Sequence, residues 1–369
     1  YSLYDSHTSS LPFEMFGHTI SFLINQMVKR SPFNIRKLIG VEKQFNPKGI
    51  GLFLHIYTLQ KKYGNPLEIE DLDGRIDYFF NWLKNNYSEG YSGHCWGYHY
   101  PWPKGDGIVV PSHTPNSVVT AFNIRAVFQY YLLTKDETCL DLINGATEFI
   151  LNDIPRTENE KGICFAYTPV KRDITINANL LAAEILAYSD YVRGTTDHQE
   201  AIKKVMNFTM IHQNDDGSWY YSYDTNTGRP KKQIDFHQGY VLETIKRICD
   251  YSTMSIDDYR VQIKSGLGFY RKNQFNDDGV AYWRLPKKWP VDIHNQSQGI
   301  ITFSLFSDYD PEYIKYGRKI ADWTIANMQH PTGRFYYQKW PFLINKISYM
   351  RWNQAWMMLA LTTLIGGKK

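Results

Sequence analysis

The stretch "GSWYYSYDTNTGRPKKQIDFHQGYVLETI", residues Gly217 to Ile245, decides the fold, because its pattern recurs along the chain. It opens with aromatic residues at the alternating spacing of a strand. It then passes through a turn rich in Gly, Pro and Lys and closes as an apolar helix. Asp235, His237 and Gln238 stand together at the start of that helix. Either helix capping or a binding site explains such a polar cluster.

The pattern occurs four more times, in segments that begin at Gly93, Gly162, Gly279 and Gly333. A sixth helix of the same kind starts near residue 46 without a preceding hairpin. The spacing between successive helix starts is 57 to 68 residues, which indicates a repeat architecture built from one unit. The predicted helix starts are Asn46, Thr114, Thr175, Asp235, Asp292 and Met350.

Two kinds of helix alternate in this repeat. The helices that follow the polar clusters, such as "NLLAAEILAYSDYV", are apolar nearly all round, which is typical of buried helices. The intervening helices, such as "HQEAIKKVMNFTMIHQ", carry apolar residues on one face and charges on the other. Six inner and outer pairs predict a single all-α domain over residues 1–369. In this closed ring the inner helices run parallel, and short aromatic hairpins form a rim.

This arrangement resembles the (α/α)6 toroid of the six-hairpin glycosidase-like superfamily, which includes endoglucanases, unsaturated glucuronyl hydrolases, glycan lyases and sugar epimerases. The resemblance covers the whole chain and implies a saccharide-binding funnel where the inner helices begin. It does not imply one reaction, because the fold hosts many chemistries. The segments "NPKGIGLFLHIY", "HTPNSVVTAF" and "YMRWNQAWM" also look like uncharacterised proteins encoded beside polysaccharide genes.

The composition is consistent with a saccharide ligand. Aromatic residues make up 16% of the chain, and such side chains serve both cores and sugar-stacking surfaces. The net charge of +4 without long Lys/Arg runs gives no support to nucleic-acid binding, and no apolar run reaches membrane-spanning length. The four cysteines form no CxxC, and no spacing requires a metal or another cofactor. No signal peptide is recognised, which favours a cytoplasmic location.

Two carboxylates suit a glycoside hydrolase, which is the first functional hypothesis. Asp235 and Asp292 each precede a histidine by two residues at the helix starts of consecutive repeats. Neighbouring helices pack about 8–10 Å apart, which suits the acid and base of an inverting mechanism. Capping alone also explains both residues. Asp106 and Asp224, in neighbouring loops, are further candidates.

A lyase or a uronyl C5-epimerase is the second hypothesis. It needs a base, an acid and groups that hold the charge of an enolate-like intermediate. We expect Arg351 to have an anionic partner, Asp292 or a substrate carboxylate, because a cation opposes the dipole at a helix N-terminus. If both aspartates act only as caps, this hypothesis gains over hydrolysis. The residues that would serve it are His113, His237, His294, Arg351, Tyr98, Tyr221 and Tyr223.

The remaining candidates bind rather than react. The segment "CWGYHYPW" predicts a sugar-stacking rim made of Trp96, Tyr98, His99 and Trp102. A buried amide without a partner costs about 1–3 kcal/mol, so the many amides at the helix starts indicate a packed network or a ligand. The full substrate-binding set adds Asn116, Asn177, Tyr221, Tyr223, Gln238, Gln296, Arg351, Asn353 and Gln354. A non-catalytic saccharide-binding protein of polysaccharide assembly is the third hypothesis.

Overall fold

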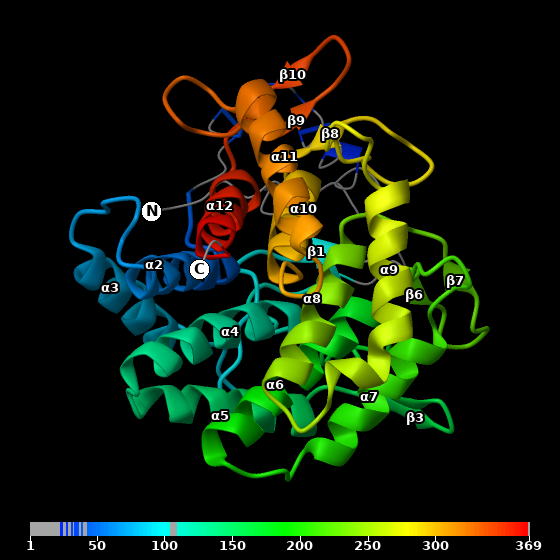
Figure 1. The fold of residues 1–369 in the computed structure, drawn as a ribbon. Coiled ribbons are helices and arrows are strands. Elements are labelled where there is room, and N and C mark those ends of the chain that lie inside the picture. The colour runs from blue at the N-terminus through cyan, green and yellow to red at the C-terminus, as the bar shows by residue number, and fades with distance from the viewer. Residues whose placement is uncertain are drawn as a thin grey trace.

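Six helices form an inner ring, and each packs against the next. In this computed structural model, which describes residues 43–103 and 109–367 and part of 23–39, α12 also packs against α2. That contact closes the ring (Figure 1). The inner helices are α2 (Pro47–Lys62), α4 (Ser117–Thr134), α6 (Ile176–Arg193), α8 (His237–Asp250), α10 (Ile293–Leu305) and α12 (Trp356–Gly366). The predicted all-α ring is therefore confirmed.

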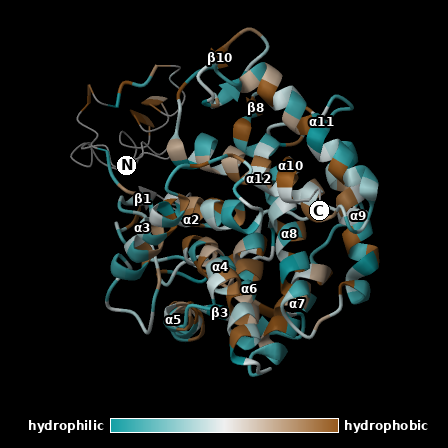
Figure 2. Cartoon of the chain, turned by 60° about the vertical axis from the view of Figure 1, so that its left-hand side comes forward, coloured by the Kyte–Doolittle hydropathy of each residue, from teal (hydrophilic) through white to brown (hydrophobic). Residues whose placement is uncertain are grey.

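Five amphipathic helices form an outer layer, each packed on the inner helix that precedes it. In α5 the residues Leu142, Ile143, Ala146, Phe149 and Ile150 are buried, which is the stripe expected of a helix with one covered face. Figure 2 shows both hydropathy colours on α9 and α11 for the same reason. The outer helices are α3 (Leu72–Asn85), α5 (Thr138–Asn152), α7 (Gln199–Ile211), α9 (Arg260–Asn273) and α11 (Pro311–Met328). A 3-10 turn, η2 (Ile256–Tyr259), precedes α9, and a π-helical turn, η3 (Met350–Ala355), precedes α12.

Short antiparallel strands connect neighbouring repeats. The sheets β5-β6-β7 and β8-β9-β10 each pair a strand that leads into an inner helix with the hairpin of the next repeat. The strands are β1 (Trp102–Pro103), β2 (Val109–Val110), β3 (Arg156–Asn159), β4 (Gly162–Phe165), β5 (Ile174–Thr175), β6 (Ser222–Tyr223), β7 (Pro230–Lys231), β8 (Val291–Asp292), β9 (Gln338–Lys339) and β10 (Ile344–Asn345). These links hold the hairpins at the end of the ring where the inner helices begin, which we call the N-terminal face.

Three of the predicted inner-helix starts are N-cap residues. Asn46, Thr175 and Asp292 occupy the caps of α2, α6 and α10. The prediction of Thr114 is wrong by two residues, because Asn116 is the cap of α4 and its Oδ1 accepts from the N–H of Val119 at 2.8 Å. The helix predicted from Asp235 begins two residues later, at the first residue of α8.

A repeated polar side chain ties each aromatic hairpin to the inner helix that follows it. Gln238 shows the geometry, because its Oε1 accepts from the N–H of Trp219 and its Nε2 donates to the carbonyl of the same residue. The bracing residues lie 58 or 59 residues apart and are Thr120, Asn179, Gln238, Gln296 and Gln354. Hairpin backbone thus takes up the amides of Gln238, Gln296 and Gln354, which gives them a structural role, and their binding of substrate stays a prediction.

A buried ionic network lies deeper along the inner ring. Arg125 donates to both oxygens of Glu184, at 2.7 and 2.6 Å, and to Glu243 at 2.7 Å. Arg247 donates to Glu243 at 3.0 Å, and the hydroxyl of Tyr188 donates to Glu184 at 2.5 Å. Arg125, Glu184 and Glu243 recur at a spacing of 59 residues, so three consecutive inner helices present these charges at one level.

No helix in the described part of the chain is both long enough and apolar enough to cross a membrane.

Candidate active site

Side chains from equivalent positions of the inner helices meet at the N-terminal face. The bracing glutamines set the register, and two residues before each of them stand Phe236, His294 and Trp352. The ring centroid of His294 lies 4.4 Å from that of Phe236 and 4.3 Å from that of Trp352. The starts of three consecutive inner helices thus bring aromatic groups into one cluster around His294, which is 1% exposed.

A tyrosine lies one helical turn below this cluster. The hydroxyl of Tyr240 and Nε2 of His294 are 2.6 Å apart, so the two groups share one hydrogen bond. Burial, and then the charge of Glu243, raise the pKa of Tyr240 well above its ordinary value. The phenol therefore stays protonated at neutral pH and is available as a proton donor to the imidazole or to a bound oxygen.

Lys48 reaches the same place from the opposite side of the ring. Its ammonium nitrogen lies 4.0 Å from the ring centroid of Phe122, 5.3 Å from that of Trp356 and 5.7 Å from that of Tyr240. These rings belong to α4, α12 and α8, so the ammonium group lies near the axis. A buried ammonium surrounded by aromatic faces is a strong local source of positive charge.

Asp235 and His237 form a second imidazole pair. Oδ1 of Asp235 lies 2.5 Å from Nδ1 of His237 and also accepts from the His237 N–H. A carboxylate only accepts, so Nδ1 carries a proton, and Nε2 presents a lone pair whenever the ring is neutral. Burial disfavours the charged form of Asp235, but the His237 ring, the hydrogen bonds to it and Arg284 outweigh burial and hold the pKa of this carboxyl below its ordinary value.

The two histidines flank the same aromatic rings. The centroid of Phe236 lies 4.2 Å from that of His237 and 4.4 Å from that of His294. The ring of Tyr240 lies 5.7 and 5.8 Å from the same two imidazoles. His237 and His294, predicted from their places in separate repeats, therefore both lie against Phe236.

Asp292 is held as an acceptor. Its Oδ1 accepts from the His294 N–H at 3.0 Å and from the indole of Trp352 at 2.9 Å. Its Oδ2 accepts from Gln338 at 2.7 Å. Three N–H donors stabilise the carboxylate form over the carboxylic acid. Asp292 therefore caps α10 and fixes the surroundings of His294.

Tyrosines and one arginine complete the N-terminal face. The guanidinium of Arg351 lies 5.5 Å from the ring centroid of Tyr98, and the ring of Tyr221 lies 4.5 Å from that of His237. Burial raises the pKa of Tyr167, and the charges of Tyr98, Tyr221 and Arg351 act on the same hydroxyl. These side chains come from different repeats, so the site is assembled from most of the ring.

Several predicted site residues lie elsewhere. Trp96 is fully buried and its indole donates to the carbonyl of Leu83, so the prediction of a stacking side chain is wrong. His113 is exposed in a turn at φ 62°, three residues before the cap of α4, and its catalytic role stays a prediction. Tyr223 contacts His212 at the end of α7, with ring centroids 4.7 Å apart, and its hydroxyl donates to the His212 carbonyl.

The predicted asparagines divide between capping, bracing and the candidate site. Asn116 caps α4, and Nδ2 of Asn353 donates to the carbonyls of Phe335 and Ile347, so both have structural roles. Asn177 is buried at the second position of α6, and its Oδ1 has no hydrogen-bond partner among the described residues. It therefore remains a candidate for binding a ligand hydroxyl.

The remaining rim candidates are placed as follows. The half-buried imidazole of His99 lies against the ring of Tyr100, which stacks in turn on Tyr98. The structure describes Trp102 only by its backbone in β1, and Asp106 lies outside the described residues. Asp224 is exposed, and its Oδ1 accepts from residues 226 and 227 within the β6–β7 turn, which explains its presence without a reaction.

Sequence reasoning missed Lys48, Phe236, Tyr240 and Trp352. The signal was present, because Phe236, His294 and Trp352 share one column once the repeats are aligned on their bracing glutamines. If the repeats are aligned on Asp235 and Asp292 instead, Phe236 and His294 are offset by one residue and the shared column is not visible. The α2 repeat has no hairpin to align, so nothing in its sequence marks Lys48 as an axial residue.

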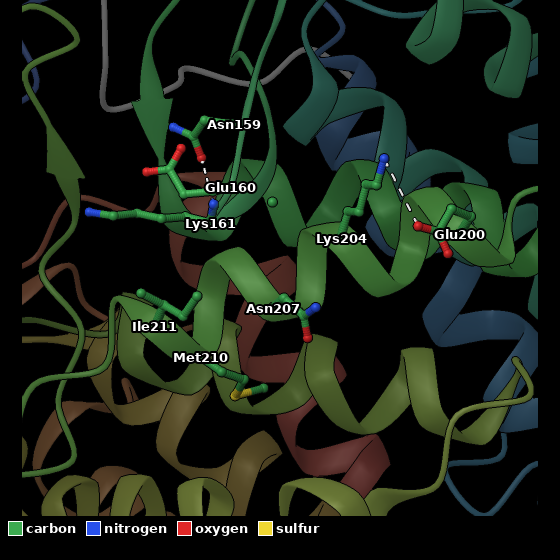
Figure 3. Close-up of a pocket in the computed structure, with 9 residues that line it drawn as sticks. Asn159, Glu160, Lys161, Glu200, Lys204, Asn207, Met210 and Ile211 are labelled. Carbon is green, nitrogen blue, oxygen red and sulfur yellow. Dashed lines mark hydrogen bonds and ion pairs between the residues drawn. The ribbon is translucent and has the colours of Figure 1, made fainter.

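A groove on the outside of the ring holds none of these residues. Its volume is about 330 Å³, and it lies between the β3–β4 hairpin and α7 (Figure 3). Lys204 crosses this region and pairs with Glu158 at 2.9 Å and with Glu200 at 3.9 Å. Lys204 is thus already paired with two carboxylates beside the groove, and the residues that line the groove include no hydrogen-bonded imidazole pair like those at the N-terminal face.

A closed ring of inner helices with an outer helical layer defines an (α/α)6 toroid, the six-hairpin glycosidase-like fold. The chain matches no protein-family model and none of the curated proteins with which it was compared. It is similar to the structure of cellobiose 2-epimerase from Bacillus thermoamylovorans, with a TM-score of 0.69, 13% identity and coverage of 89% of this chain and 90% of that chain. A GH76 α-mannanase from Bacteroides thetaiotaomicron gives a TM-score of 0.63, 14% identity and coverage of 87% and 86%. An unsaturated glucuronyl hydrolase specific for heparin gives 0.62, 13% identity and coverage of 87% and 86%. These likenesses show the fold.

Proposed function

We propose that this protein is a saccharide-processing enzyme that transfers a proton at a carbon next to a carbonyl or carboxylate group. The observation that carries the proposal is that the Asp235–His237 pair and the His294–Tyr240 pair both contact Phe236. Epimerisation or isomerisation is the preferred outcome, with elimination from a uronate as its variant. The similar fold of proteins described as cellobiose 2-epimerase and D-mannose isomerase supports this choice.

The proposed steps conserve all atoms of the substrate. Nε2 of His237 takes the proton from the carbon, and the electron pair of the broken C–H bond moves toward the carbonyl oxygen. The His294–Tyr240 pair gives one proton to that oxygen, and Lys48 stabilises the negative charge that develops there. In epimerisation a solvent proton adds to the opposite face of the carbon, the pair takes its proton back from the oxygen, and His237 releases the abstracted proton to solvent. In isomerisation His237 passes its proton to the former carbonyl carbon, and the hydroxyl proton on the first carbon goes to the His294–Tyr240 pair.

Hydrolysis, the first sequence hypothesis, is the second candidate. It is favoured by the presence of Asp235 and Asp292 at the same face of the ring, and the mannanase and the glucuronyl hydrolase are hydrolases with this fold. A glycosidase needs one carboxylic acid with a raised pKa. Asp235 has a lowered pKa and Asp292 accepts three hydrogen bonds, so both are better suited to remain carboxylates.

The test is proton exchange with solvent. Reducing disaccharides, monosaccharides and uronate-containing oligosaccharides are incubated with the protein in D₂O, and the sugar C–H signals are followed by NMR. We expect deuterium to replace one carbon-bound proton. His237→Ala and His294→Ala are expected to slow this exchange by about 10²–10⁴-fold. His330→Ala is the matched control, because that imidazole is partly exposed, is bonded to Thr332 in the turn after α11 and contacts none of the four paired residues.

Other products would identify other functions. Hydrolysis would give shorter saccharides that have gained water and carry no deuterium on carbon. If these products form and Asp292→Asn no longer makes them, proton transfer is refuted in favour of hydrolysis. Unsaturated uronates would show elimination. Saccharide binding without exchange or cleavage across the panel would leave the third hypothesis, a non-catalytic binding protein.

A further inference from the structure

The edge of the β8-β9-β10 sheet carries large apolar side chains that face solvent. Phe342, in the turn between β9 and β10, is 103% exposed, and Trp340 and Leu343 beside it are also exposed. Val291 pairs with Lys339, and continuing this antiparallel register places the exposed Trp289 opposite Pro341, the residue that follows Trp340. Figures 1 and 2 show this hairpin standing clear of the helices at one end of the molecule. We call Trp289, Trp340, Phe342 and Leu343 the aromatic edge.

Lysines surround the aromatic edge, and acidic residues are missing from both segments. Residues 279–291 and 333–351 contain no Asp or Glu. Lys287, Lys288 and Lys346 are exposed, and Lys339 is partly exposed. The ion pairs formed by the described residues use other lysines and arginines. The edge therefore combines an apolar tip with uncompensated positive charge.

A glycan chain is a poor match for the tip. Phe342, Leu343 and Pro341 have no side-chain hydrogen-bonding atoms, so sugar hydroxyls placed against them would lose their hydrogen bonds to water without replacement. A bilayer interface accepts the same groups without that loss. Indole rings favour the headgroup level, apolar side chains insert toward the acyl chains, and lysines contact anionic headgroups.

We infer that the aromatic edge docks this protein on a membrane surface that contains anionic lipid. Phe342 and Leu343 enter the interface, Trp289 and Trp340 lie at headgroup level, and the four lysines pair with lipid phosphates. The same sheet contacts the candidate site, because Gln338 of β9 donates to Asp292. Docking therefore brings the N-terminal face of the ring close to the bilayer. This inference does not depend on the proposed reaction.

The test is co-sedimentation of the full chain with vesicles. Vesicles of phosphatidylcholine alone are compared with vesicles that also contain phosphatidylglycerol, at low and at raised salt. We expect pelleting with the anionic vesicles, weakened by salt. Phe342→Ser with Leu343→Ser is expected to lower partitioning by about tenfold or more. Lys339→Gln with Lys346→Gln is expected to lower it by about fivefold per lysine.

The control changes apolar residues that are exposed elsewhere. Val261→Ser with Ile211→Ser, on α9 and α7, removes exposed apolar area away from the edge and is expected to pellet like the wild type. Failure of the wild type to pellet with anionic vesicles would overturn the inference. Equal pelleting of the wild type and the Phe342→Ser, Leu343→Ser variant would do the same. The wild type could instead be retained on an immobilised polyuronate without binding vesicles, and the variant could lose that retention. That result would reassign the edge to an acidic glycan.

Discussion

Arg125→Met tests the role of the buried ionic network in holding three inner helices together. Arg125 is 1% exposed and forms a bidentate pair with Glu184 as well as a bond to Glu243. Burial lowers the pKa of Arg125, but the two carboxylates outweigh burial and raise it above its ordinary value, so the guanidinium is charged. Met has a similar length and no charge.

The cost of the substitution falls mainly on Glu184. Glu243 keeps Arg247 and Gln298, whereas the structure gives Glu184 only the hydroxyl of Tyr188. Removing one partner of a buried pair costs about 3–5 kcal/mol. An unfolding entropy of roughly 2.1 cal/mol/K per residue over 369 residues gives about 0.8 kcal/mol/K, so Tm is expected to fall by about 4–6 °C.

The assay is thermal unfolding followed by circular dichroism, with urea unfolding as a second measure. Arg125→Met with Glu184→Gln is the informative double variant. It removes the orphaned carboxylate and is expected to recover about half of the lost stability. A single variant as stable as the wild type would refute the reasoning, and so would a double variant no more stable than Arg125→Met.

Three further predictions concern the hairpins and the core. Gln296→Leu leaves the buried Ala281 N–H and its neighbours without partners, so we expect a loss of about 1–3 kcal/mol per orphaned group in urea unfolding; an unchanged midpoint would show that water replaces the brace. Gly217→Ala places a methyl group 2.5 Å from the carbonyl oxygen of residue 265 at φ +91°, whereas Gly228→Ala at φ +66° meets no atom within 4 Å. Gly217→Ala should therefore destabilise more, and equal effects would contradict this contact. Burial, and then the charges of Arg247, Arg125 and Lys62, lower the pKa of His55 well below 6.5, so the folded state keeps His55 neutral while the unfolded chain binds a proton. The stability that His55 contributes is thus complete above pH 6.5 and is lost as the pH falls below 6.5. In His55→Asn the free energy of unfolding should depend less on pH in this range. An identical pH dependence in the variant would exclude His55 as the cause.

The ring was predictable because the signals that define it are local and repeated. N-cap hydrogen bonds of Asn46 and Asp292 act within one helical turn, and the period near sixty residues shows that one unit is copied. The pairing of His237 with Asp235 also follows from a separation of two residues. Such short-range relations do not depend on the tertiary structure of the rest of the chain.

The roles of individual polar residues were less predictable, because one side-chain type serves two purposes. Gln238 at a helix start suits a ligand and a hairpin brace equally well, and only the position of Trp219 decides between them. The aromatic segment around Trp96 predicts a place on the rim. Whether a loop side chain points to solvent or into the core depends on its packing, which for Trp96 is against Leu83. Lys48 contacts rings of three other helices, none of which is near it in sequence.

Closure of the ring determines when the candidate site forms during synthesis of the chain. The helix that packs against α2 and sets Trp356 beside Lys48 is α12, the last inner helix to be made. Until α12 emerges, α2 and α10 each have a flank without its neighbour, and such uncovered apolar surface attracts chaperones or other nascent chains. The candidate site is therefore among the last features of the molecule to form, and a ribosome-bound chain that stops before α12 carries most of the site residues without the site.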